Sequence, residues 1–538
     1  MFSMKLRLIG AAGIFISTLS FSQTSQQDYP AKNWFNQDVK EENANGVSTN
    51  EAYQYLKGKS SATVLVAIID SGIDIDHEDL KDVIWTNPGE IAGNNIDDDG
   101  NGYVDDIHGW NFIGGVDGFN VGPANFEVTR EYRRLKDKYI NKKPSNNPNY
   151  IYWQEIKKGY TEGLAKAISQ RDFYDSLRQS IERSNKLMTA YLNVDELSLD
   201  LLMSVKSPDK EIVQATNFMG NMLMMIGDTD LNEVIGQLEE TANHFDLQVE
   251  FGYNLDYNAR SIVGDNPNKL DEVGYGNNDV KGMDTDNLHG THVAGIIAAK
   301  RDNNIGINGI ANNIRIMALR AVPDGDERDK DVANAIRYAV DNGAKIINMS
   351  FGKAYSPHKA YVDQAIKYAE KHGVLLVHAA GNSSKNIDLK YNYPTKKLGK
   401  KQVANNWLEV GASAWGDNEE LAASFSNYGK HTVDLFAPGV QIYSTVPGNQ
   451  YANEQGTSMA SPVVAGVAAL VLSYFPSLSA TELKDILMQS TRKFDGLMVL
   501  KPGSREEKVD FANLSISGGI VNAYEAVKLA ESRKITLK

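Results

Sequence analysis

The chain has 538 residues, of which 42% are hydrophobic and 23% are charged, and its formal net charge is −14. That length exceeds one ordinary hydrophobic core, so we expect one large domain of about 300 residues and an additional part. The acidic balance, with no basic stripe, argues against nucleic acid and against an anionic membrane surface as partners. The absence of cysteine excludes disulfides and thiolate metal sites but leaves the compartment open.

The N-terminus has the pattern of a secretory signal peptide. Lys5 and Arg7 precede an apolar stretch at 8–19, and small or polar residues follow at 20–23. We therefore expect a signal peptide at 1–22 and an N-terminal segment at 23–59. An uncleaved anchor is the alternative, although the apolar stretch is short for crossing a bilayer. Cleavage predicts a secreted protein, extracellular or periplasmic, that does not associate with a membrane.

Apolar strands alternate with amphipathic helices over most of the remaining chain. This pattern predicts an α/β fold with a mostly parallel sheet and helices on both faces. The predicted strands are 64–69, 314–322, 345–349 and 374–379, and the predicted helices between and after them include 329–341 and 359–372. Asp70, Ser350 and Asn382 follow the carboxyl ends of such strands. Active sites of open α/β sheets gather at that edge.

A polar region with helical periodicity interrupts this pattern at 121–282. It predicts a helical insertion with helices near 130–141, 149–187, 194–204 and 210–226. Four methionines, Met219, Met222, Met224 and Met225, are interpreted as the core of this helical part, with an adaptable binding surface as the alternative.

Three short motifs carry candidate catalytic groups. Ser458 lies in 456–462 (GTSMASP), at the start of an apolar helix, where free N–H groups and the helix dipole favour a developing negative charge. Asp70 begins the run DSG directly after a strand, and His289 begins 289–295 (HGTHVAG). Each has an ordinary structural explanation when taken singly, as a turn or a helix cap. His289 and His292 could also bind a metal, but the Glu of a His-Glu-x-x-His site is absent.

Taken together, these runs resemble the signatures of the subtilisin-like serine proteases, which share the chain order Asp, His, Ser. Further matching runs are 67–72 (AIIDSG), 348–352 (NMSFG), 379–382 (AAGN) and 437–439 (APG). The resemblance covers about 45–120 and 280–530. It predicts a peptidase domain formed by 60–120 and 283–535.

The resemblance also assigns roles to individual residues. It implies that Ser458 is the nucleophile, His289 the general base and then the general acid, and Asp70 the group that orients the imidazole. It makes the Asn382 side chain part of the oxyanion hole, although a turn after a strand is the plainer explanation for Gly-Asn. Ser350, Phe351 and Gly352 resemble the edge that binds an extended peptide.

The predicted function is therefore that of a secreted serine endopeptidase that hydrolyses polypeptides through an acyl-enzyme. One alternative is a non-catalytic binding protein on a protease scaffold, although all four chemical groups are present. A nucleotide-binding enzyme would need a G-x-G-x-x-G turn after the first strand, and 70–74 (DSGID) does not supply one.

An acidic loop predicts a calcium site. Aligned to the EF-hand loop, Asp97, Asp99, Asn101, the Tyr103 carbonyl and Asp105 take five ligand positions. The twelfth position is His108 rather than Glu, so Asp106 or a distant carboxylate must compensate. Hard oxygen ligands suit calcium, and a solvated acidic loop is the alternative.

The segment at 23–59 is too short for the pro-domain that most secreted members of this family carry. We therefore hypothesise that the helical insertion shields or shapes the cleft.

Overall fold

The computed structural model describes residues 30–38, 44–227, 229–283, 286–399 and 401–536, and side chains to 533. The predicted signal peptide at 1–22 lies outside the described residues, as does the beginning of the predicted N-terminal segment. The chain forms two compact units. One comprises Pro144–Asn254, and the other comprises Pro30–Lys143 with Leu255–Lys538.

The larger unit is built on a nine-stranded sheet with the order β12-β15-β9-β8-β5-β4-β1-β3-β2. All neighbouring strands are parallel except the edge pair β12 and β15. The strands are β1 Val64–Asp70, β2 Gly109–Asn111, β3 Ile314–Arg320, β4 Ile346–Met349, β5 Leu375–Ala379, β8 Trp407–Ser413, β9 Leu435–Pro438, β12 Arg492–Lys493 and β15 Gly519–Ile520. Three hairpins lie outside this sheet: β6 Lys397–Leu398 with β7 Gln402–Val403, β10 Ile442–Val446 with β11 Gln450–Glu454, and β13 Met498–Leu500 with β14 Lys508–Asp510.

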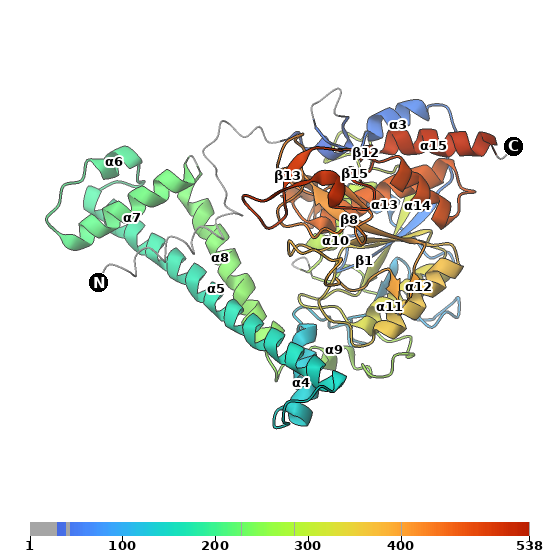
Figure 1. The fold of residues 1–538 in the computed structure, drawn as a ribbon, viewed down its shortest axis with the longest axis horizontal. Coiled ribbons are helices and arrows are strands. Elements are labelled where there is room, and N and C mark those ends of the chain that lie inside the picture. The colour runs from blue at the N-terminus through green and yellow to red at the C-terminus, as the bar shows by residue number, and fades with distance from the viewer. Residues whose placement is uncertain (1–29, 39–43, 228, 284–285, 400, 537–538) are drawn as a thin grey trace. The chain divides into compact units, whose positions relative to one another are not determined.

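Helices cover both faces of the sheet, as the sequence predicts (Figure 1). Val66 and Ile68 of β1 face a core built with α10, α13, α14 and α15, whereas Ala67 and Ile69 face a core built with α11 and α12. This alternation follows from the two-residue period of a strand. The helices of this unit are α3 Thr49–Tyr55, α4 Glu127–Tyr139, α9 Arg260–Val263, α10 Leu288–Ala298, α11 Asp329–Asp341, α12 Lys359–Lys371, α13 Thr457–Tyr474, α14 Ala480–Gln489 and α15 Ala523–Thr536.

Helix α13 is the buried centre of the unit. Among the described residues it alone is long and apolar enough to cross a membrane, yet 89% of it is buried inside the protein. Its apolar character is therefore explained by the core. Trp34 and Phe35, from the predicted N-terminal segment, are fully buried in the same core.

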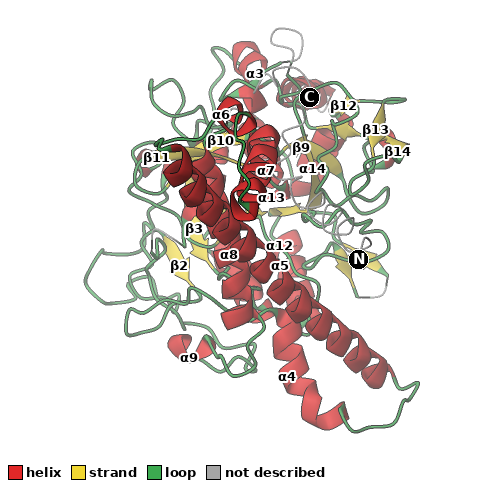
Figure 2. Cartoon of the chain, turned by 90° about the vertical axis from the view of Figure 1, so that its left-hand side faces the viewer, coloured by secondary structure: helices red, strands yellow, loops and turns green. Residues whose placement is uncertain are grey.

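The smaller unit is helical and consists of α5 Pro148–Leu192, α6 Leu199–Met203, α7 Lys210–Ile226 and α8 Leu231–Leu247, followed by a short π-helix at Gln248–Gly252. Figure 2 displays α8 alongside the long helix α5, and the two helices contact each other. Met219 and Met222 are buried in its core, but Met224 and Met225 are exposed. The prediction of a methionine core thus holds for two of the four residues.

The compact helical unit is narrower than the insertion predicted at 121–282. Residues 121–143, with α4, and 255–282, with α9, belong to the unit that contains the sheet. The reason is packing: Val121 and Ala124 on one side and Ala259 and Val263 on the other are buried in the core under α11 and α12.

Candidate active site

Asp70 and His289 form a close pair at the carboxyl edge of the sheet. Asp70 is the last residue of β1, and His289 is in the first turn of α10. His289 Nδ1 lies 2.7 Å from Asp70 Oδ1, which also accepts the N–H of Ser71 at 2.8 Å. Asp70 is only 2% exposed. The carboxylate thus fixes the imidazole with Nδ1 protonated and leaves Nε2 as the nitrogen able to accept a proton.

Glycine at position 290 allows this approach. A Cβ added to Gly290 would lie 2.1 Å from the carbonyl oxygen of Gly72 and 3.2 Å from the Cβ of Asp70. No side chain fits there without moving α10 away from the end of β1.

The electrostatics of His289 favour its protonated form. Burial disfavours the imidazolium, but the negative charge of Asp70, the hydrogen bond to it and the charge of Glu454 together raise the pKa of His289. Glu454 ends strand β11, four positions before Ser458. Sequence analysis missed Glu454, because no motif includes it.

His292 has a different environment. It is fully buried, and its Nε2 donates to the carbonyl oxygens of Ile442 and Ala452 at 3.0 and 3.2 Å. Burial lowers the pKa of His292 to about 4, so it stays neutral. It therefore ties α10 to the hairpin of β10 and β11.

Ser458 lies in the first turn of α13, after the N-cap residue Gly456. Its hydroxyl donates to the carbonyl oxygen of Ser350 at 3.0 Å, and the Ser350 hydroxyl donates back to the carbonyl oxygen of Ser458 at 2.8 Å. The structure thus joins the serine to the end of β4. Its hydroxyl is directed to Ser350 and makes no hydrogen bond with His289 within the described part of the chain.

Asn382 is held next to this serine by Thr457. The Asn382 Oδ1 accepts both the N–H and the hydroxyl of Thr457, at 2.9 and 2.8 Å. Its Nδ2 is therefore the free end of the amide. A Cβ added to Gly456 would lie 3.1 Å from Asn382 Nδ2 and 3.5 Å from the backbone nitrogen of Ser458. Two N–H donors, neither with a partner among the described residues, thus border one small space beside Gly456.

The predicted peptide-binding residues follow β4. The backbone of Lys353 pairs with Tyr393, with both N–H to carbonyl distances at 2.9 Å. Since backbone groups alternate in direction along an extended chain, the groups of Gly352 face away from Tyr393, on the side of the Ser350 carbonyl. Phe351 instead packs its ring edge-on against buried His378, with 6.3 Å between ring centroids. The Tyr393–Pro394 peptide bond is cis.

The sequence model of the subtilase family matches residues 61–513. The chain belongs to the subtilase family. It is 43% identical over 220 residues to a thermophilic serine proteinase of Bacillus sp. strain AK1, which covers 41% of this chain and 50% of that protein. It is 39% identical over 203 residues to subtilisin DY of Bacillus licheniformis, covering 37% and 69% of the two chains, and 38% identical over 243 residues to thermitase of Thermoactinomyces vulgaris, covering 45% and 75%.

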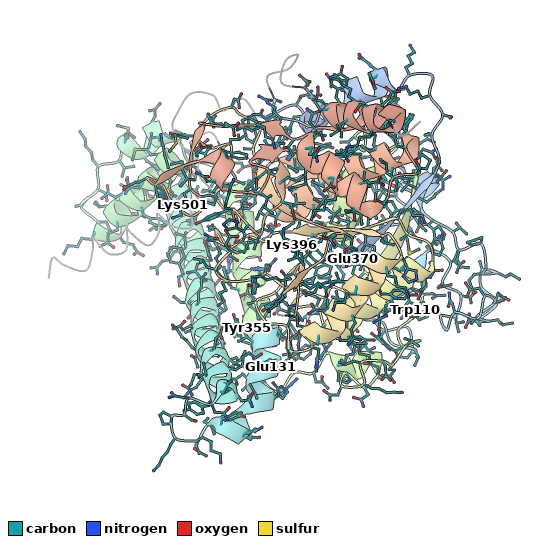
Figure 3. All side chains as sticks on the ribbon, turned by 45° about the vertical axis from the view of Figure 1, so that its right-hand side comes forward. Trp110, Glu131, Tyr355, Glu370, Lys396 and Lys501 are labelled. Atoms are coloured by element: carbon teal, nitrogen blue, oxygen red, sulfur yellow. The ribbon has the colours of Figure 1, made fainter. Side chains whose placement is uncertain are left out.

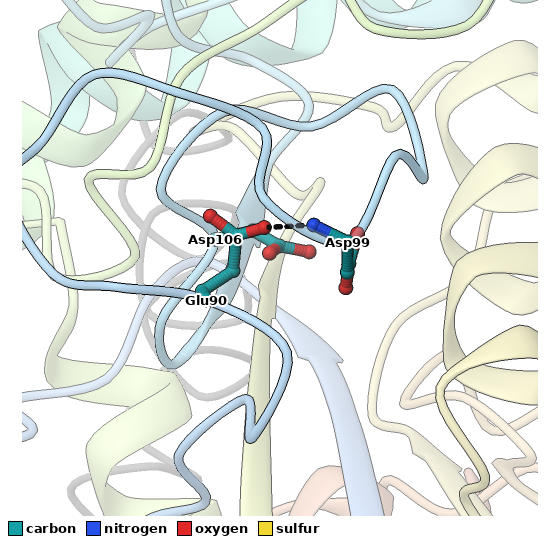
Figure 4. Close-up of side chains that lie close together, drawn as sticks. All are labelled: Glu90, Asp99 and Asp106. Atoms are coloured by element: carbon teal, nitrogen blue, oxygen red, sulfur yellow. Dashed lines mark hydrogen bonds between the residues drawn. The ribbon is translucent and has the colours of Figure 1, made fainter.

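A second candidate site in this subtilase is the acidic loop after β1. The structure brings together the carboxylates of Glu90, Asp99 and Asp106, with one oxygen of each within 4.8 Å of the others (Figure 4). Asp106 is fully buried, and burial raises its pKa despite hydrogen bonds from Tyr338, Asn101 and Asn87. One Glu90 oxygen, Oε2, is buried without a hydrogen-bond partner among the described residues.

This group differs from the ligand set predicted from the EF-hand alignment. Only Asp99 of that set belongs to it. Asp105 has a φ of 53°, and its carboxylate accepts the N–H groups of Gly93 and Asn95 at 2.9 and 2.7 Å instead. Asp97 accepts the N–H groups of Asn101 and Gly102.

The other two predicted ligands belong to the frame of the loop. Asn101 donates its amide to Asp99 and Asp106 at 3.1 and 3.0 Å. The Tyr103 ring packs edge-on against Trp110, with 5.0 Å between centroids; Trp110 is labelled in Figure 3. The chemistry of the three converging carboxylates, all hard oxygen donors, fits a calcium ion.

Proposed function

We propose that this subtilase is a secreted serine endopeptidase that hydrolyses polypeptides through an acyl-enzyme. The observation that carries the proposal is the pair of buried Asp70 and partly exposed His289 at 2.7 Å, at the sheet edge where Ser458 lies in the first turn of α13. In this mechanism the Ser458 hydroxyl leaves the Ser350 carbonyl and gives its proton to Nε2 of His289 while Oγ attacks the peptide carbonyl. His289 then protonates the leaving amine, and water hydrolyses the ester by the same route.

Asp70 acts in this cycle through charge and orientation. It keeps the proton of His289 on Nδ1 and stabilises the imidazolium that forms during both steps. The raised pKa of His289 is consistent with that stabilisation.

The tetrahedral intermediate places a negative charge on the former carbonyl oxygen. The Nδ2 of Asn382 and the N–H of Ser458 lie 3.1 and 3.5 Å from the same point next to Gly456, and we assign the oxyanion to the space that they border. Donors that are already oriented stabilise developing charge without reorganisation, which is usually the largest catalytic contribution. Thr457 supplies the orientation.

An extended substrate binds at residues 350–352 in this proposal. The substrate residue before the scissile bond donates to the Ser350 carbonyl, which displaces the Ser458 hydroxyl from it. The third residue before that bond then pairs with the backbone of Gly352, because groups on one side of a strand recur every two residues. Main-chain pairing of this kind accepts many sequences.

We also propose that Glu90, Asp99 and Asp106 hold a structural calcium ion. The ion would offset most of the charge of three converging carboxylates and give the orphaned Oε2 of Glu90 a partner. It would stabilise the loop without taking part in catalysis. Secretion rests on the N-terminal signal pattern at residues 1–22.

Reaction with a serine-directed fluorophosphonate tests the catalytic assignment. We expect wild-type protein to be labelled and to hydrolyse a peptide substrate, and Ser458→Ala to lose both. Ser383→Ala, an exposed serine next to Asn382, is the matched control and should retain both. Folded wild-type protein that neither reacts nor hydrolyses any peptide in a mixed library would instead favour a non-catalytic binding protein.

A further inference from the structure

Lys353 is a buried lysine directly after the proposed peptide-binding edge. It is 4% exposed, and its ammonium has three acceptors: the Glu127 carboxylate, the carbonyl oxygen of Glu327 and the Asp329 carboxylate, each at 2.8 Å. An ammonium has three donors, so all of them are used. We call Lys353, Glu127, Arg130 and Asp329 the Lys353 cluster.

The three acceptors come from three elements that are distant in sequence. Glu127 begins α4, Glu327 lies in the loop after β3, and Asp329 begins α11. The order of the sheet places β1 between β3 and β4, so the loop after β3 and the edge after β4 lie on either side of the end of β1, where Asp70 is found. The ammonium of Lys353 therefore bridges the two sides of the sheet edge that carries the catalytic pair.

Arg130 completes the bridge from α4. Its guanidinium makes two hydrogen bonds to Glu127, at 2.7 and 3.2 Å, and donates to the carbonyl oxygens of Asp326 and Glu327 at 2.9 and 3.1 Å. Glu127 is thus held between two buried cations. Burial opposes its charge, but Arg130 and Lys353 together hold the pKa of Glu127 far below its usual range. The cluster is charged and fully paired.

The backbone of Lys353 is equally constrained. Its N–H and carbonyl both pair with Tyr393, so the side chain and the main chain fix the residue from different directions. Gly352 has no side chain of its own to hold it, and a Cβ there would lie 2.4 Å from the Asn392 amide nitrogen. The position of Gly352 is therefore set by its neighbours, and the Lys353 side chain is bonded to α4, to the loop after β3 and to α11.

We propose that Lys353 is a positioning residue for substrate binding: held by Glu127 of α4, it fixes Gly352 where the third residue of the acyl part of a polypeptide can pair with it. This inference rests on the proposed function and deepens it. It also gives α4 a role. The segment that leads from the sheet into the helical unit completes the substrate-binding edge.

The proposal predicts an effect that depends on substrate length. A substrate with a single acyl residue reaches Ser350 but not Gly352, whereas one with three acyl residues reaches both. Extending the acyl part from one to three residues should raise kcat/KM in the wild-type protein. Loss of the Lys353 ammonium should reduce this gain, mainly because KM for the longer substrate rises. Hydrolysis of the one-residue substrate should be nearly unchanged.

The experiment compares esters with one and with three acyl residues, and an amide with three acyl residues. Each substrate is measured with wild-type protein and with Lys353→Met. Fluorophosphonate titration gives the concentration of active sites in each sample. We expect the gain on extension to fall by roughly tenfold, which corresponds to about one lost hydrogen-bonding interaction. Lys330→Met is the matched control: Lys330 is 2% exposed and also has three oxygen acceptors, but within the described part of the chain it makes no hydrogen bond or ion pair with residues 350–353.

Two further variants protect the test against misfolding, since removing one partner of a buried ion pair is destabilising. Glu127→Gln keeps the shape of the acceptor and should give a smaller loss of the same kind, and Lys353→Arg should restore part of the gain. Equal losses on short and long substrates, or an unchanged gain in Lys353→Met and Glu127→Gln, would overturn the proposal. Absent labelling and absent ester hydrolysis in wild-type protein would instead overturn the proposed function.

Discussion

The Nδ1 atom of His289 lies 2.7 Å from Oδ1 of Asp70, across 219 positions of sequence. The fold achieves this by placing the end of β1 against the first turn of α10, at a contact that only glycine at position 290 permits. The carboxylates around the imidazole then influence its pKa, and the pH dependence of kcat/KM measures that influence.

The first prediction concerns pH. The general base must be neutral, so activity is lost as pH falls through the pKa of His289, and a raised pKa places this loss at higher pH than for a free imidazole. Glu454→Gln removes one charge that favours the imidazolium. We expect the acidic limb of kcat/KM to move to lower pH by less than about one unit, since Asp70 contributes more. Glu506→Gln, at an exposed residue that is not among the charges acting on His289, should leave the profile in place. A shift of the Glu454 variant to higher pH would contradict the assignment.

The second prediction concerns the oxyanion donors. Asn382→Ala should lower kcat by about 10²–10³ with little change in KM, which is the magnitude measured for such a donor in subtilisin, a member of the same family. Thr457→Val should give a smaller loss, because the amide keeps its bond to the Thr457 N–H but not to the hydroxyl. Steady-state kinetics on one peptide substrate checks both. An unchanged kcat in Asn382→Ala would place the oxyanion elsewhere.

The third prediction concerns calcium. Saturating calcium at about 100 times its Kd should stabilise the wild-type protein by about 2.7 kcal/mol relative to chelator, which raises the midpoint of thermal unfolding by several degrees. Glu90→Gln and Asp99→Asn should lose most of this difference.

Asp97→Asn is the matched control for this test. It lies in the same loop outside the carboxylate group, and an amide oxygen can still accept the N–H groups of Asn101 and Gly102. We expect it to keep the calcium-dependent shift. Loss of the shift in Asp97→Asn with retention in Glu90→Gln would favour the ligand set of the EF-hand alignment.

The fourth prediction compares two helical glycines. Gly290→Ala would place a methyl group 2.1 Å from the Gly72 carbonyl oxygen and should separate His289 from Asp70, with loss of most peptidase activity. Gly220→Ala, in α7, meets nothing within 4 Å and should stabilise the helical unit by about 0.5–1 kcal/mol. Activity assays and thermal unfolding of the two variants check this, and comparable activity in both would be inconsistent with the proposed pair.

The sequence predicted four of the nine strands of the sheet, β1, β3, β4 and β5, because local signals were strong there. The predicted helices 329–341 and 210–226 match α11 and α7 in both bounds, and buried strands such as 64–69 differ from the structure by one residue. Helix α8 was not predicted, although its buried residues Val234, Leu238 and Ala242 recur at helical spacing. The limits of the insertion were set too wide, because packing of residues 121–143 against the sheet unit depends on distant partners.

In the candidate sites, too, residues in local motifs were predicted, whereas groups brought together from distant parts of the chain were not. Motifs identified Asp70, His289, Asn382 and Ser458, since each lies in a run of distinctive residues. The acidic loop was recognised, but the carboxylates that converge in it differ from the aligned set, because Asp105 turns away at a positive φ and Glu90 lies before the aligned loop. Glu127 and Lys353 lie 226 positions apart, and no local pattern connects them.

The double hydrogen bond from Thr457 to Asn382 has a consequence for how the site tolerates heat. The Asn382 amide is anchored by the residue immediately before Ser458, so two hydrogen bonds link the loop after β5 to the first turn of α13. When that loop moves on warming, we expect Ser458 and the Asn382 amide to move together, so that the distance between them changes little. Inactivation on warming should then begin with the imidazole, whose support comes from a different pair of elements.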